Sequence, residues 1–369
     1  MSKKTVITIL SWCAALAIAL ILANVVSFFY RSGAGSIQRV NAYSTSIRTP
    51  NSRIVRGAEG YGINAVDENG YLNDNTQPLK QNYILLMGSS HAEGLQIMQK
   101  DTMASVLNRM LDPDERTVYN IGTAGQTFPL IVEGFQAAIE EFPKAEAIMM
   151  EVSKLDFSEA DFTCAMDQAV YDLASSGQAL ERSLGFSRRL RNGILGVLPV
   201  VSQLRQQIDS VDLSLRDAFG IAAFLEQYRA KAAAEQPAAP VPAETVTAQT
   251  GADTYAVQIN QMMALMRAEF DHPIILLYHS GVSLLPDGTL RINRDMEHYD
   301  DFKNACETND IVFLDAGDAF LRAYEADHSV PYGFNNTTKP SGHLNTLGHR
   351  IAAEEFYKAW MQIREEEEN

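Results

Sequence analysis

Cysteine is scarce in this sequence: the chain of 369 residues contains three, at Cys13, Cys164 and Cys306. No CxxC pair or cluster of cysteine with histidine is present, so the chain lacks a ligand set typical of zinc. Cys13 falls inside an apolar N-terminal segment, which leaves at most one internal disulfide, between the other two. We therefore expect neither a disulfide framework nor a metal or organic cofactor.

Positive charge is also in short supply. The chain has 30 Lys and Arg residues against 46 Asp and Glu, a formal net charge of −16 and a sequence pI of about 4.9. A field of this sign repels phosphate backbones, so nucleic acid is not an expected partner. The surplus acid suits solubility, and the run Glu365–Glu368 predicts a frayed acidic tail over residues 364–369.

Charge is absent altogether from one stretch near the N-terminus. Val6–Tyr30 runs for about 25 residues without a charged side chain, which is long enough to cross a ~30 Å hydrocarbon core as a helix. The apolar region of a cleaved secretory signal is usually ~7–15 residues, so cleavage is the weaker alternative. Lys3 and Lys4 favour a cytoplasmic N-terminus. We expect residues 1–30 to form a single-pass membrane anchor with the rest of the chain outside the cytoplasm, where other membrane proteins are possible partners.

The remainder divides by composition. Residues 31–80 are polar and rich in Ser, Asn and Gly, and the Asn69-Gly70 turn signal predicts a stem followed by an entrance hairpin. From Tyr83 to Met87 the chain is continuously apolar, as in a strand buried on both faces of a parallel sheet. Such strands alternate with helical patterns, which predicts a three-layer α/β/α, doubly wound, flavodoxin-like domain over residues 81–363. The further strands are expected at Thr117–Ile121, Ala147–Val152, Pro273–Tyr278 and Ile311–Leu314, and helices at Thr102–Leu111, Leu130–Glu141 and Leu347–Trp360.

A long interruption of this alternation lies at residues 157–270. It is helical in period but too long for one crossover, so we expect a helical insertion, with a flexible Ala/Pro/Thr-rich loop at 230–254. Arginines from Arg182 to Arg205 surround the apolar stretch GILGVLPVV. This pattern fits either a helical cap over the core, the favoured interpretation, or a segment resting on anionic lipid.

Ser90 is the candidate nucleophile. In LLMGSSHAEGLQI, residues 85–97, a buried strand ends at Gly88 and a helix follows, so Ser90 should project from the carboxyl edge of the sheet, where open α/β folds keep their sites. Backbone N–H groups at the helix start could stabilise an oxyanion. A strand, a Gly-Ser turn and a helix also occur for purely structural reasons, because Ser and Gly are ordinary turn and cap residues.

His343 is the candidate general base. It sits in the loop of GFNNTTKPSGHLNTLGH, just before the last helix, from which it could face the turn after the first strand. His349 lies on a different helical face, so both cannot point at one serine. His91 should diverge from Ser90, and His279, His298 and His328 look unremarkable.

Three segments of the chain resemble the sequence blocks of SGNH (GDSL-like) hydrolases. GSSHAEG resembles the block that carries the nucleophilic serine, and SGHLNTLGH the block that supplies the base. NIGTAGQT resembles the second block, which implies Gly125 as an oxyanion donor beside the Ser90 N–H. The resemblance spans about residues 55–362 and implies an SGNH hydrolase fold of the membrane-anchored bacterial type.

The chain departs from the family's pattern at two functional positions. Leu155 stands where the family has an oxyanion asparagine, and Pro340 stands where its DxxH motif has the acid of the triad. The acid's place could be taken by a backbone carbonyl near Pro340 or by Asp327, and the oxyanion donor by Asn120 or Asn336.

These patterns predict a serine esterase or acyl transferase. The resemblance and the expected topology imply acyl groups, O-acetyl above all, on a cell-surface polysaccharide or similar envelope substrate. The expected substrate is therefore an acylated carbohydrate or a lipid-like ester. The alternative is a weak or inactive accessory protein of a membrane envelope-biosynthesis assembly on the same scaffold. A flavodoxin-like binding domain with a fortuitous Gly-Ser turn is a third possibility, and it predicts that Ser90 and His343 lie far apart.

Overall fold

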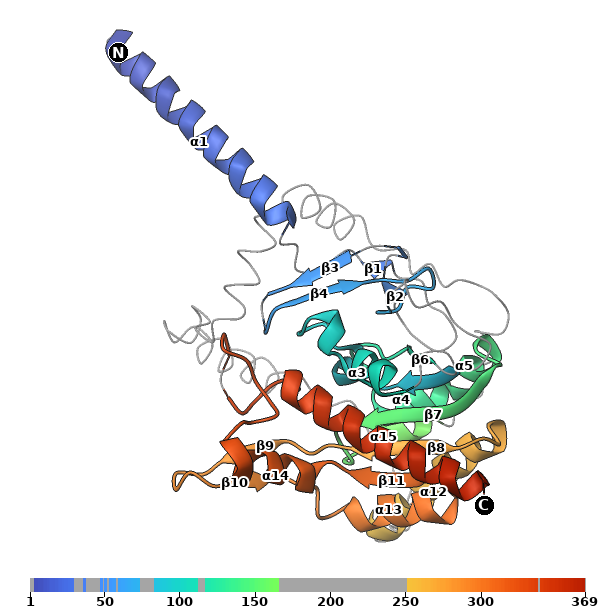
Figure 1. Cartoon of the computed structure of the whole chain (residues 1–369). Helices are drawn as coiled ribbons and strands as arrows, with labels where there is room; N and C mark the ends of the chain where they lie inside the picture. The colour runs from blue at the N-terminus through green and yellow to red at the C-terminus, as the bar shows by residue number, and fades with distance from the viewer. Residues whose placement is uncertain are drawn as a thin grey trace, which may run out of the picture. The chain divides into compact units, whose positions relative to one another are not determined.

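A computed structural model describes residues 3–29, 36–37, 47–48, 50–51, 53–57, 59–73, 83–111, 117–165, 251–337 and 339–368 (Figure 1). The arginine-rich segment of the predicted insertion and most of the predicted 230–254 loop lie outside these ranges. The N-terminal helix and the sheet-containing domain belong to separate compact units, so each is described by itself.

The first unit contributes helix α1 (Lys3–Phe29), which has 27 residues. Its segment Lys3–Val26 has a mean hydropathy of 2.6 and is long enough to cross a bilayer. A secretory signal passes the same test of length and composition, so the helix supports the membrane anchor weakly and says nothing of its orientation.

The second unit is built on a five-stranded parallel sheet of order β11-β8-β7-β5-β6. Each predicted strand is present to within two residues at either end. Counted along the chain the order is 2-1-3-4-5, the flavodoxin-like arrangement, which places its switch point between β5 and β7. The strands are β5 (Tyr83–Met87), β6 (Thr117–Asn120), β7 (Ala145–Val152), β8 (Ile274–Tyr278) and β11 (Val312–Asp315).

Helices cover both faces of this sheet, which makes the three layers (Figure 1). Every residue of β5 is buried, because alternate side chains enter two different cores: Leu85 and Met87 pack into one, Ile84 and Leu86 into the other. The first core is covered by α4 (Phe128–Glu133), α5 (Phe135–Glu141), α12 (Gly251–Glu269) and α13 (Tyr299–Thr308), the second by α3 (Met103–Met110), α14 (Gly317–Asp327) and α15 (Thr346–Glu368).

Three boundaries differ from the sequence prediction. The helix expected over Leu130–Glu141 is two helices separated by Gly134. Helix α12 packs Ile259 and Met262 into the core, so it is a layer of the domain rather than part of an insertion reaching residue 270, and residues 251–254 are helical rather than loop. Helix α15 continues to Glu368, so the acidic tail is its exposed last turn.

The entrance segment is the chain between residues 47 and 73. Its hairpin pairs β3 (Arg53–Arg56) with β4 (Gly62–Ala65), and residues 57–61 connect the two strands. Asn69 and Gly70 form a separate turn closed by Asp67, whose carboxylate accepts the N–H groups of Asn69 and Tyr71. The smaller elements are β1 (Ser36–Ile37), β2 (Ile47–Arg48), α2 (Ser90–Glu93), η1 (Gln99–Asp101), α6 (Glu159–Ala165), β9 (Val282–Leu284) and β10 (Leu290–Ile292).

Candidate active site

Ser90 is the first residue of α2, three residues after strand β5 ends. Gly88 makes this tight turn possible: its φ is +151°, and a Cβ there would lie 2.7 Å from Ala92 Cβ and from a carboxylate oxygen of Glu151. Ser89 caps the helix, with its hydroxyl accepting the N–H of His91. The turn thus places Ser90 at the switch point of the sheet, the position at which open α/β folds bind ligands.

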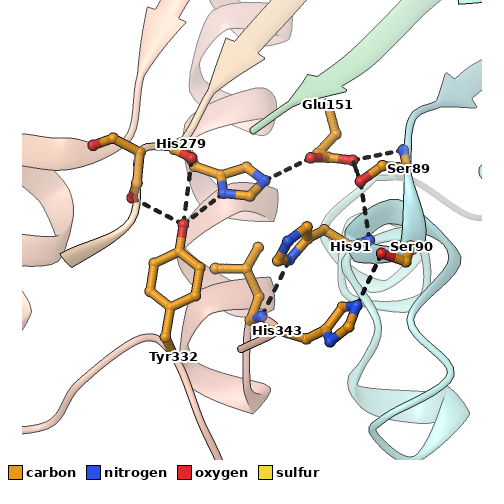
Figure 2. Close-up of polar contacts among 9 residues, drawn as sticks. Ser89, Ser90, His91, Glu151, His279, Tyr332 and His343 are labelled. Atoms are coloured by element: carbon orange, nitrogen blue, oxygen red, sulfur yellow. Dashed lines mark hydrogen bonds and ion pairs between the residues drawn. The ribbon is translucent and has the colours of Figure 1, made fainter. Parts of the chain in front are cut away.

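His343 meets Ser90 across 253 residues of sequence. Its Nε2 lies 2.9 Å from Ser90 Oγ, and the two side chains face each other in Figure 2. The loop that carries His343 is fixed by a bridge between Tyr332 and Leu344 and by a bond from the Gly333 N–H to the His343 carbonyl. Both site residues predicted from the sequence are therefore within hydrogen-bonding reach, and the binding-domain alternative, which required them to be far apart, is wrong.

The other face of His343 is bound by Glu59, a residue that the sequence did not single out. Glu59 Oε2 lies 2.7 Å from His343 Nδ1, and Oε1 accepts the His343 backbone N–H at 2.8 Å. Burial by itself would raise the pKa of Glu59, but the hydrogen bonds and charge of His343 outweigh it and lower the pKa below its ordinary value. An ionised carboxylate only accepts, so Nδ1 carries the proton and Nε2 presents its lone pair to Ser90.

The two substitutes considered for the missing acid are both wrong. Asp327 ends α14, where its carboxylate accepts the N–H of Ser329. The Nδ1 of His343 is bonded to Glu59 and not to a carbonyl near Pro340. No local sequence signal distinguished Glu59, because only the fold brings this carboxylate to His343.

The predicted oxyanion donors, the N–H groups of Ser90 and Gly125, are backbone groups. Gly125 lies in the loop after β6 with φ +90°, and no side chain or backbone atom lies within 4 Å of the position its Cβ would take. The neighbouring Thr123 N–H donates to the Gly88 carbonyl, which ties this loop to the serine turn. Within the described part of the chain, no hydrogen bond occupies the N–H of Ser90 or of Gly125.

Neither asparagine that the sequence suggested adds its side-chain amide to these oxyanion donors. Leu155 is fully buried in the apolar core and its side chain has no hydrogen-bond donor. Asn120 donates its amide to the Ala92 carbonyl and accepts the Gly122 N–H. Asn336 donates to the Gly57 and Gly60 carbonyls, and both proposed substitutes are thus engaged elsewhere.

A second polar network, which we call the buried network, consists of Ser89, Glu151, His279 and Tyr332 (Figure 2). Glu151 Oε1 lies 2.7 Å from His279 Nε2, and His279 Nδ1 lies 2.7 Å from the Tyr332 hydroxyl. Burial alone would raise the pKa of Glu151, but the hydrogen bond and charge of His279 lower it to about 2, so the group is ionised. The expectation that His279 would be unremarkable is wrong. A signal was present, because a lone charged residue in the apolar strand AIMMEV must find a partner.

The other histidines near the site have structural partners. His91 Nδ1 accepts the Leu344 N–H, and its ring centroid lies 4.9 Å from that of His343. Burial and the nearby His279 hold the pKa of His91 well below its usual range, so it is neutral near pH 7. His349 accepts the Met103 N–H and does not point at Ser90, as predicted. Among the described residues, no group of three His, Cys, Asp or Glu side chains could hold a metal ion.

The arrangement agrees with the order of the sequence motifs: serine after the first strand of the parallel sheet, glycine after the second, and histidine before the last helix. The domain has the three-layer, flavodoxin-like α/β/α fold that the sequence predicts. No family model and no curated protein matches the chain.

Solved structures with a similar course of chain include esterases. An acetyl xylan esterase, AlAXEase, is 9% identical, with 75% of this chain and 98% of that one covered and a TM-score of 0.37. The esterase EstA from Pseudoalteromonas sp. is 10% identical, covered at 76% and 99%, with a TM-score of 0.35. A lipolytic G-D-S-L family protein from Veillonella parvula is 9% identical, covered at 76% and 98%, with a TM-score of 0.34. At such low identity, only the residues of this chain can indicate its chemistry.

Proposed function

We propose that the protein is a serine ester hydrolase or acyl transferase in which Ser90 is the nucleophile and His343 the general base. The observation that carries the proposal is the 2.9 Å contact between Ser90 Oγ and His343 Nε2. Ser90 is half-buried and the His343 side chain is 25% exposed, so an ester can reach the pair. A serine hydroxyl bonded to an imidazole lone pair is the arrangement that activates serine for attack on a carbonyl.

The reaction follows from the positions of these groups. Ser90 Oγ forms a bond to the acyl carbon while its proton passes to His343 Nε2. The tetrahedral oxyanion is held by the N–H groups of Ser90 and Gly125. Collapse breaks the bond to the alcohol, which leaves with the proton from His343, and an acyl-Ser90 enzyme remains. Water then completes hydrolysis, or a sugar hydroxyl completes transfer, with His343 again taking the proton.

The substrate class is proposed from the predicted topology and from the sequence resemblance. An anchor over residues 1–30 with a cytoplasmic N-terminus would hold the catalytic domain outside the cytoplasm, against the envelope. O-acetyl groups of an envelope polysaccharide are then the substrate we favour. A reporter fused to the C-terminus that fluoresces or is cleaved only outside the cytoplasm tests this topology, and absence of its signal when the fusion protein is present at full length would exclude it.

A fluorophosphonate probe tests the chemistry, because it labels a serine covalently only when a base activates it. The full-length protein should be labelled and the Ser90→Ala variant should not. The control is Ser283→Ala, which changes a serine on β9 bonded to Asn293 and should be labelled as the wild type is. The accessory-protein alternative draws its support from the missing asparagine at Leu155. It predicts no labelling of the wild type and no hydrolysis of short-chain aryl esters.

A further inference from the structure

Glu59 reaches His343 from the entrance segment, which precedes the sheet in sequence and follows the apolar helix. Ser90 Oγ, the imidazole of His343 and the carboxylate of Glu59 form one line of hydrogen bonds at 2.9 Å and 2.7 Å. We propose that Glu59 is the positioning acid of this serine site, so that the segment between the membrane helix and the sheet is a working part of the active site. The inference rests on the proposed function.

The contact is two-pronged, which sets it apart from a chance surface ion pair. One carboxylate oxygen holds the ring nitrogen and the other holds the backbone N–H of the same residue, so both the ring orientation and the loop are fixed. Gly342, with φ +90°, makes room for this: a Cβ there would lie 2.4 Å from Glu59 Oε1. Any other residue before His343 would push the carboxylate away.

The turn that carries Glu59 is held by the loop that carries His343. Asn336 donates its amide to the carbonyls of Gly57 at 3.1 Å and Gly60 at 3.2 Å, and its oxygen accepts the Gly60 N–H at 2.9 Å. Acid and base therefore move together rather than independently. An acid and a base that must stay aligned need hydrogen bonds of this kind, because small misplacements of a base cost large factors in rate.

The hairpin behind the turn is fixed to the chain that follows Ser90. Asn64 on β4 donates to the Leu95 and Ile97 carbonyls, and a Cβ on Gly62 would lie within 2.5 Å of the same two oxygens. The hairpin backbone thus lies directly against the serine helix and its continuation. Glu59 is presented from a packed element and not from a free stem.

The entrance segment also supports the oxyanion side. Arg48 Nε donates to Glu93 Oε1 at 2.9 Å, and Glu93 Oε2 accepts the N–H of Ala124, the neighbour of Gly125, at 3.1 Å. Glu93 is almost fully buried, so its carboxylate needs these partners. One stretch of about 25 residues therefore steadies the base through Glu59 and the oxyanion loop through Arg48.

The test uses full-length protein in detergent with Glu59→Gln, Glu59→Asp and a control, Glu68→Gln, which removes an exposed carboxylate from the same segment. With a p-nitrophenyl ester, Glu59→Gln should lower kcat by about 10²- to 10⁴-fold with KM nearly unchanged, as expected when the acid of a serine site is lost. Glu59→Asp, which keeps the charge but is shorter, should recover part of the loss. Glu68→Gln should match the wild type. If Glu59→Gln retains wild-type kcat, or Glu59→Asp is no better than Glu59→Gln, the inference is overturned.

A second measurement separates this inference from the esterase proposal. In protein with ¹⁵N-labelled histidine, the His343 Nδ1 proton should give a downfield NMR resonance that is present in the wild type and Glu68→Gln but lost in Glu59→Gln and His343→Ala. If this resonance is present and fluorophosphonate never labels Ser90, the contact stands and the esterase proposal fails. If Ser90 is labelled equally fast in the wild type and in Glu59→Gln, the esterase proposal stands and the role of Glu59 fails. Absence of the resonance from the wild type also overturns the role of Glu59.

Discussion

Glu151 binds Ser89, the residue just before the nucleophile, twice: its Oε2 accepts the Ser89 N–H and the Ser89 hydroxyl, each at 2.8 Å. A buried carboxylate from the neighbouring strand thus binds both the backbone and the side chain of Ser89. The serine turn is therefore held both by Glu151 on β7 and by the entrance segment.

Replacing Glu151 should cost stability as well as activity. Glu151→Gln removes the charge that binds His279 and Ser89, and we expect the free energy of unfolding to fall by about 2–4 kcal/mol, the range for losing a buried charged partner. Urea denaturation at pH 7 measures this. Glu297→Gln, at an exposed site, is the control and should change little. An unchanged midpoint for Glu151→Gln would contradict the buried network as a stabilising element.

The same carboxylate predicts an acid-dependent loss of stability. The pKa of Glu151 is about 2 in the folded protein against an ordinary 4.5, so the unfolded chain binds more protons between these values. The stability contributed by Glu151 is therefore complete above about pH 4.5 and lost as the pH falls toward 2. The difference in unfolding free energy between wild type and Glu151→Gln should shrink over that window, and a constant difference would show that Glu151 is not the cause.

His349 should make the protein sensitive to milder acid. Burial, together with the charge of His279, lowers the pKa of His349 from 6.5 to about 3. Below pH 6.5 the histidine is protonated in the unfolded chain but stays neutral in the folded protein. This residue alone should therefore lower the free energy of unfolding by about 2 kcal/mol as the pH falls from 7 to 5. His349→Asn, which can still accept the Met103 N–H, should lose less over this range. Equal losses in both proteins would refute the assignment.

The hydrogen bonds that hold the turn carrying Glu59 can be removed without changing Ser90, His343 or Glu59 itself. Asn336→Ala removes three hydrogen bonds to the turn between β3 and β4, and we expect kcat to fall by about 10- to 100-fold because the base is less well oriented. Asn335→Ala is the matched control, since Asn335 is an exposed neighbour that binds Lys339. Steady-state kinetics on an aryl ester measures both variants, and equal kcat values would show that Asn336 does not help to orient the base.

Placing an asparagine at Leu155 should not raise the proposed activity. Leu155 is fully buried among apolar side chains, so Leu155→Asn would place an amide in the core and lower stability by about 2–5 kcal/mol without raising kcat. Leu155→Met, which keeps the volume apolar, should cost less than about 1.5 kcal/mol. A gain in kcat for Leu155→Asn would mean that this position does reach the oxyanion.

Much of the sheet could be predicted from the sequence because strands buried on both faces leave continuous apolar runs such as Tyr83–Met87. Ser90 and His343 were identifiable because each stands at a strand or helix boundary that local pattern reveals. Glu59 was not, since nothing local distinguishes it from Glu68, and only tertiary packing brings it to His343. The network of Glu151 and His279 is intermediate: its members stand out as polar residues beside apolar strands, but their pairing is set by the register of β7 against β8.

The separation along the chain between Glu59 and His343, 284 residues, bears on biosynthesis. Residues 59 and 90 are translated well before residue 343, so the carboxylate and the hydroxyl are made before the imidazole. A nascent or prematurely terminated chain ending before position 343 would carry Ser90 without its imidazole partner, so its hydroxyl would be an unactivated alcohol under the proposed mechanism.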